Sequence, residues 1–116
     1  MTNEEIEMLR KTIEGVFGEC KIEFDDDDHS VYVEARKAAV MILPDVVEVD
    51  TITGPRDVPG WAIGLVNGDG DFEDECTTEL FWEMVTTTAE LLAEQAVYAV
   101  RDNLDIPPLY REPQYE

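Results

Sequence analysis

Basic residues are scarce in this sequence. Eight Lys and Arg stand against 28 Asp and Glu, which gives a net charge of -20. Proteins bind nucleic acid through its phosphates mainly because Lys and Arg displace counterions. Direct binding to DNA or RNA is therefore close to excluded, and anionic membranes are disfavoured for the same reason. Charge of one sign also weakens the compact state by self-repulsion, so we expect a function, salty surroundings or a basic partner to compensate for it.

Histidine and cysteine are almost absent. His29 is the single histidine, and the two cysteines, Cys20 and Cys76, lie far apart and form no CxxC motif. A metal site made of several His or Cys ligands is therefore not available. We expect reduced thiols rather than a disulfide, and neither a metal nor a cofactor.

Long apolar runs are missing as well. No run approaches the roughly 20 residues of a membrane span, and the start of the chain, MTNEEIEMLRK, has neither the basic nor the apolar region of a signal peptide. These two absences predict a cytoplasmic protein, located in the host cytoplasm if it is viral.

Apolar residues are nevertheless sufficient for a fold, because they make up 44% of 116 residues. We expect a single acidic domain over 1–106, followed by a loosely ordered tail at 107–116. Apolar residues at helical spacing predict a helix at 3–17, with a capping box formed by Thr2-x-x-Glu5 and a stop at Gly18.

Several stretches then alternate apolar and polar residues with the two-residue period of a half-buried strand. The first, 20–24, is followed by a hairpin loop, DDDDHS. The second, 31–43, changes its pattern near Arg36 and Lys37, which indicates a bulge or a break. After a Pro-Asp turn, the remaining segments are a strand at 46–52, a Pro/Gly-rich loop at 53–60 and a strand at 61–66.

The last predicted element is a long helix from about residue 74 to residue 103, which ends before a Pro-Pro pair. The sequence therefore predicts an α+β fold: an N-terminal helix, an antiparallel sheet of three to four strands, and a long C-terminal helix. Both helices are expected to pack on one face of the sheet.

The acidic stretch NGDGDFEDECTTE at 67–79 does not match a calcium-binding EF-hand loop. An EF-hand needs a Gly at position 6 and a bidentate Glu at position 12. Neither residue is in place when the loop is counted from Asn67 or from Asp69. We interpret the stretch as a turn followed by a helix start, where the helix dipole favours carboxylates. These carboxylates are Asp71, Glu73, Asp74 and Glu75.

The predicted C-terminal helix carries a row of glutamates on one face. On a wheel of about 100° per residue they fall within an arc of about 100° and extend for about 28 Å. Neighbouring like charges at i,i+4 are unfavourable by about 0.2 to 0.5 kcal/mol each. No cation lies between Arg56 and Arg101, a stretch of 44 residues with ten carboxylates. The row consists of Glu75, Glu79, Glu83, Glu90 and Glu94.

A second acidic cluster, Asp25, Asp26, Asp27 and Asp28, lies in the predicted hairpin loop. A surface of one sign suits a strongly basic partner, and nucleic-acid-binding grooves are the commonest such surfaces. In size, charge and helix-borne carboxylates the chain resembles phage-encoded DNA-mimic inhibitors of the anti-restriction or anti-CRISPR type. The resemblance includes no motif, so no residue roles are carried over. It implies a non-enzymatic inhibitor that binds the DNA- or RNA-binding surface of a host defence nuclease or CRISPR effector.

Three other interpretations remain open. Salt adaptation of a halophilic cytosolic protein would produce the same acidic, Lys-poor composition. An acidic chaperone or immunity protein for a basic client would combine charge with apolar contacts, and Trp82 could also mediate a homodimer. Catalysis by His29 beside the aspartates, or by a carboxylate pair, has no diagnostic spacing, so we do not expect an enzyme.

Overall fold

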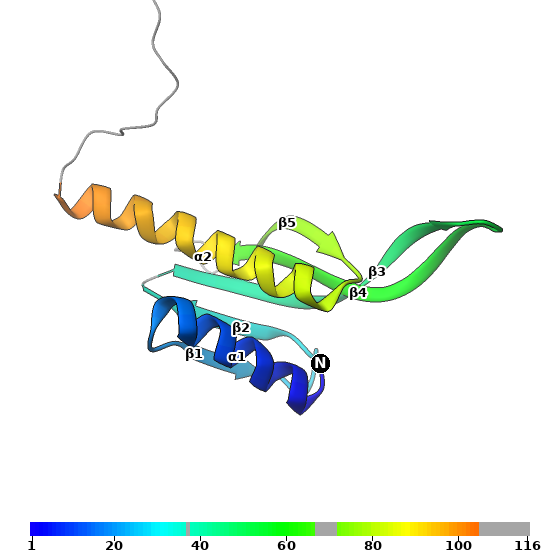
Figure 1. Cartoon of the computed structure of the whole chain (residues 1–116), viewed down its shortest axis with the longest axis horizontal. Helices are drawn as coiled ribbons and strands as arrows, with labels where there is room; N and C mark the ends of the chain where they lie inside the picture. Colours follow the sequence, from blue (N-terminus) through cyan, green and yellow to red (C-terminus); the bar gives the residue numbers. More distant parts are fainter. Residues whose placement is uncertain (37, 67–71, 105–116) are drawn as a thin grey trace, which may run out of the picture.

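The computed structural model describes residues 1–36, 38–66 and 72–104, without the side chains of 73–75, 96 and 98–104 (Figure 1). Along the chain, one helix precedes and one helix follows five strands. Their bounds are α1 Asn3–Phe17, β1 Lys21–Phe24, β2 Val31–Ala35, β3 Ala38–Thr51, β4 Gly54–Val66, β5 Phe72–Thr78 and α2 Phe81–Leu104.

Helix α1 begins and ends at the residues that the sequence predicts. The Thr2 hydroxyl accepts a hydrogen bond from the Glu5 N–H at 3.1 Å, and the Glu5 carboxylate accepts one from the Thr2 N–H at 2.9 Å. This capping box satisfies two of the free N–H groups at the helix start. At the other end Gly18, with φ of 81°, donates its N–H to the Glu14 carbonyl at 2.8 Å. The prediction of a helix at 3–17 is confirmed.

The five strands form one antiparallel sheet in the order β1-β2-β3-β4-β5. Both helices contribute to a single core against this sheet, with α1 beside β1 and β2 and α2 beside β3, β4 and β5 (Figure 1). Alternate residues of β2 and β3 are buried, as expected for strands with one covered face. The α+β class is confirmed, with five strands instead of three to four. The largest fully buried core residues are Leu9, Ile13, Val31, Val33, Val40, Ile42, Ile63, Met84, Val85 and Leu92.

The chain does not turn at Pro44 and Asp45, and of the predicted loop at 53–60 only Thr53 lies in a turn, because β4 begins at Gly54. Strand β3 continues to Thr51 and pairs with β4 from Val40 to Thr51. Because β2 pairs with β3 only as far as Ile42, and β5 pairs with β4 only as far as Trp61, residues 44–61 project as a two-stranded ribbon (Figure 1). We call this ribbon the β-arm. Prolines are tolerated in it at positions whose N–H would point away from the partner strand.

The predicted helix start at about residue 74 is also wrong. Residues 72–78 form β5, and α2 begins at Phe81. The register of β5 against β4 shifts between Ile63 and Gly64, which are opposite Cys76 and Asp74. This bulge interrupts the two-residue period, so the strand cannot be recognised from alternation. The helix start is equally hidden: the Leu80 carbonyl accepts the first bond, from the Met84 N–H at 3.0 Å, and Leu is a poor N-cap residue.

The break expected near Arg36 is confirmed as the turn between β2 and β3. Arg36 has φ of 52°, a left-handed conformation that is uncommon outside glycine. Its Nε donates to the Phe17 carbonyl at 2.9 Å. The positive guanidinium lies at the C-terminal end of α1, where the helix dipole is negative, and this interaction is favourable. The Arg36 side chain therefore links the turn to the end of the helix.

Candidate functional site

Three glutamates on α2 form an exposed row on the side opposite the core. Glu83, Glu90 and Glu94 are exposed, whereas Val85 and Leu92 on the other side are buried. On the helical wheel the three span an arc of about 40° and a length of about 16 Å. We call them the α2 acidic row.

The longer row expected from the sequence is shortened at its start. Glu79 is exposed but lies in the link before α2, and Glu75 belongs to β5. Glu73 and Asp74 also belong to β5, and therefore do not sit at a helix N-terminus. Asp71 lies outside the described residues.

The hairpin aspartates lie where the sequence places them, in the loop between β1 and β2, and all four are exposed. Backbone hydrogen bonds order this loop: Asp25 Oδ1 accepts from the Asp27 N–H at 2.8 Å, and Asp28 Oδ1 accepts from the Ser30 N–H at 2.9 Å. The bonds from Ser30 lower the pKa of Asp28 below its ordinary value. The loop backbone therefore holds the carboxylates of Asp25 and Asp28 in place.

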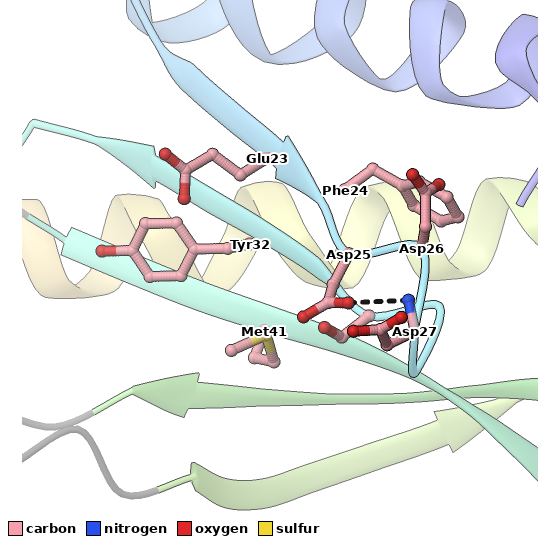
Figure 2. Close-up of a pocket in the computed structure, with 8 residues that line it drawn as sticks. Glu23, Phe24, Asp25, Asp26, Asp27, Tyr32 and Met41 are labelled. Carbon is pink, nitrogen blue, oxygen red and sulfur yellow. Dashed lines mark hydrogen bonds between the residues drawn. The ribbon is translucent and has the colours of Figure 1, made fainter.

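An open hollow of about 850 Å³ lies beside these aspartates, on the side of the sheet away from the helices (Figure 2). The pairing of β1, β2 and β3 brings three of its residues side by side, because Glu23 is opposite Tyr32 and Tyr32 is opposite Met41. Carboxylates next to an aromatic ring can accept a Lys or Arg side chain. The hollow is lined by Glu23, Phe24, Asp25, Asp26, Asp27, Ser30, Tyr32 and Met41. Neither Glu23 nor Tyr32 was predicted as a site residue, and the available signal for them was their place in two neighbouring alternating segments.

Tyr32 is held protonated in this hollow. Its hydroxyl donates to Glu34 Oε2 at 2.7 Å. This bond, followed by burial and the charges of Glu34 and Glu23, raises the pKa of Tyr32 from 10.0 to about 12.

We therefore expect the phenol of Tyr32 to ionise at a pH of about 12 in the folded protein. Because its pKa is higher in the folded state, its contribution to stability is complete below pH 10.0 and is lost as the pH rises to about 12. A spectrophotometric titration of tyrosinate in the wild type and in Tyr32→Phe tests this. The difference between the two curves should have its midpoint near pH 12; a midpoint near 10 would contradict it.

The described residues form two ion pairs, one of which involves Glu23 of the hollow. Arg10 pairs with Glu7 at 3.7 Å, and Lys21 pairs with Glu23 at 3.1 Å. Both pairs are exposed, and such pairs contribute about 0 to 1 kcal/mol. Neither pair involves the α2 acidic row or the loop aspartates.

Within the described ranges, no group of three or more His, Cys, Asp or Glu side chains is placed to hold a metal ion. Residues 67–71, the first part of the stretch compared with a calcium loop, lie outside these ranges. Cys20 and Cys76 are free and partly buried, and burial, together with the charge of Glu14, raises the pKa of the Cys20 thiol. Neither α1 nor the described part of α2 has the length and apolar composition that crossing a membrane requires.

No protein-family model, curated protein or solved structure matches the chain. The function must therefore be inferred from the surface itself.

Proposed function

We propose that the protein is a non-enzymatic, acidic inhibitor that binds the basic DNA- or RNA-binding surface of another protein. The observation that carries the proposal is the α2 acidic row, Glu83, Glu90 and Glu94, exposed along one side of a helix whose other side is core. The stretch 57–100 supplies no Lys or Arg to neutralise it.

Two properties of the row suit mimicry of a nucleic acid. A helix packed on a sheet fixes the backbone positions of its glutamates, and Glu90 and Glu94 are separated by about 6 Å along the axis, comparable to successive phosphates of one strand. A rigid array of one sign also steers a basic partner from a distance and penalises partners of the wrong charge. A host defence nuclease or a CRISPR effector presents a basic groove of the matching kind.

Charge reversal of Glu83, Glu90 and Glu94 to Lys should weaken partner binding by about 100-fold or more, because like charges placed against each other cost several kcal/mol. The partner is captured from a host lysate with the wild-type protein and identified. Its affinity for both proteins is then measured, with duplex DNA as competitor. Mimicry requires that duplex DNA displaces the wild-type protein.

The matched control reverses three exposed glutamates elsewhere, Glu4, Glu14 and Glu19. It makes the same change in net charge but leaves α2 intact, so its effect should be about tenfold smaller or less. Equal losses in both variants would show that overall charge, and not the α2 acidic row, determines binding.

Salt adaptation is the second candidate function, because exposed carboxylates also occur on α1 and on the β-arm, as at Glu14 and Glu48. Thermal unfolding at about 0.1 M and about 3 M NaCl separates the two, since salt screens repulsion between exposed charges. A protein that folds only at the higher concentration would support salt adaptation and contradict the inhibitor proposal.

A further inference from the structure

Among the described strands, only β5 pairs with an outer edge of the β-arm, and it does so at the root, where Thr78 is opposite Trp61. The arm contains eight paired positions, from Pro44↔Trp61 to Thr51↔Gly54, and is therefore about 25 Å long. A two-stranded ribbon is only marginally stable in water by itself, and its outer N–H and C=O groups are a template for another strand. The arm is thus the part of this sheet most suited to accept a further strand.

Prolines block the edge formed by β4. Pro has no N–H, so it fits at strand positions whose N–H points away from the partner strand. Pro59 is opposite Val46 and Pro55 is opposite Asp50. Since the two kinds of position alternate along an antiparallel pair, the pair between them, Glu48 and Asp57, is of the same outward-facing kind.

The same alternation leaves the edge formed by β3 open. Val46, Glu48 and Asp50 direct their N–H and C=O groups away from β4. A hydrogen bond confirms this direction independently, because the Val46 N–H donates to the Asp45 carboxylate at 2.8 Å and not to β4. Of the four outward positions on each strand of the arm, two on β4 are prolines, Pro55 and Pro59, whereas on β3 only Pro44 at the root is one. Within 45–51 the β3 edge therefore keeps an N–H at every outward position.

The side chains of the arm indicate what kind of strand would fit. On one face Glu48 lies directly opposite Asp57, a like-charged pair that is destabilising in the free protein. On the other face Val47 is opposite Val58, and both are partly buried. A strand with alternating basic and apolar residues would neutralise the first face and extend the second. A second copy of this chain, with its charge of -20, would add repulsion instead.

A groove of about 580 Å³ lies at the root of the arm, where the free edge begins. Apolar side chains form most of its walls, and Glu5 is also among the residues that line it. It is therefore suited to the end residue of a docked segment. Its walls include Met1, Phe24, Pro44, Pro59 and Trp61.

We propose that the free β3 edge of the β-arm, residues 45–51, binds an extended segment of a basic protein by strand addition, with alternating basic and apolar side chains. Main-chain hydrogen bonds would supply affinity and the alternating side chains specificity. The proposal uses a different surface from the α2 acidic row and does not depend on that row being a nucleic-acid mimic.

Two proline variants distinguish the loss of an N–H donor at the β3 edge from the loss of a carboxylate. Glu48→Pro and Asp57→Pro remove one carboxylate each from the same cross-strand pair, but only the first removes a donor from the β3 edge. Binding of a fluorescent peptide of about eight alternating Lys and Val residues is measured by anisotropy. Glu48→Pro should weaken binding by about tenfold or more, and Asp57→Pro by about threefold or less. Equal weakening would overturn the proposal.

Amide hydrogen exchange in the wild-type protein provides a test that needs no variant. The peptide should slow exchange of the outward N–H groups of Glu48 and Asp50 and leave that of Asp57 unchanged. Slowing at Asp57 alone, no slowing at all, or equal binding of a peptide with its Lys and Val residues in two blocks would overturn the proposal. So would sedimentation showing a dimer that Glu48→Pro disrupts, because the occupant would then be a second copy.

The α2 charge-reversal variant keeps the two proposals apart. It should still bind the alternating peptide within about threefold of the wild type, since its changes lie outside the β-arm. Loss of peptide binding in this variant would overturn the assignment of the peptide to the β3 edge.

Discussion

Leu92→Ala is expected to lower the free energy of unfolding by about 2 to 5 kcal/mol. Leu92 is fully buried on α2 and belongs to the core cluster that joins both helices to the sheet. Removal of its side chain leaves a cavity that the surrounding strands cannot fill without moving. The same change should loosen the helix that carries the α2 acidic row, so partner binding should weaken as well.

Urea unfolding followed by circular dichroism at constant ionic strength measures this change. Glu90→Ala is the control, because Glu90 lies two residues away and is exposed; its effect should stay within about 0.5 kcal/mol. If Leu92→Ala lowered the free energy of unfolding by as little as Glu90→Ala, α2 would not be packed on the sheet as described.

Gly60→Ala is expected to destabilise the protein by about 1 to 3 kcal/mol, or more. A Cβ at residue 60 would lie 2.5 Å from the Thr78 carbonyl oxygen and 2.8 Å from Val47 Cγ2. The valine can rotate, but the carbonyl belongs to the backbone at the end of β5. The link between β5 and α2 would therefore have to shift, which changes the root of the β-arm and the start of α2 together.

A glycine elsewhere in the chain provides a control of opposite sign. Gly15 lies in α1, and a Cβ built on it meets nothing within 4 Å. Gly15→Ala should therefore stabilise the protein by about 0.5 to 1 kcal/mol, because Ala restricts the unfolded chain and favours the helix. A Gly60→Ala variant as stable as the wild type would contradict the close packing at the arm root.

Elements set by local signals were predictable from the sequence. Helix α1 has its capping box and its terminal Gly18, and the β1–β2 hairpin has a polar loop between two alternating segments. The break at Arg36 was visible as a change of hydrophobic pattern. In each case the sequence signal lies within a few residues along the chain, even though the Arg36 side chain also bonds to the distant Phe17 carbonyl.

Elements that depend on distant pairing were not predictable. The Pro- and Gly-rich part of β4 looks like a loop, and only its pairing with β3 makes it a strand. Strand β5 contains a bulge and consists largely of acidic and polar residues, which indicated a helix start instead. The second strand of a projecting ribbon has no recognisable sequence pattern when its residues are not buried in the core.

The candidate site also has parts that were predictable from local sequence patterns and parts that depend on distant pairing. The exposure of Glu83, Glu90 and Glu94 followed from helical periodicity alone, and that of the loop aspartates from turn chemistry. Glu79 and Glu75 were misplaced because the helix start lacks a capping residue. The hollow beside Tyr32 depends on the register of three strands, which periodicity does not determine.

The sheet order β1-β2-β3-β4-β5 also determines how this chain assembles. Every strand pairs with its neighbour in sequence, so each pairing closes a short loop at a small entropic cost. Folding rates are higher when contacts are local. The strands can therefore add one hairpin at a time, and the chain never has to bring two remote, equally charged segments together before either has a partner.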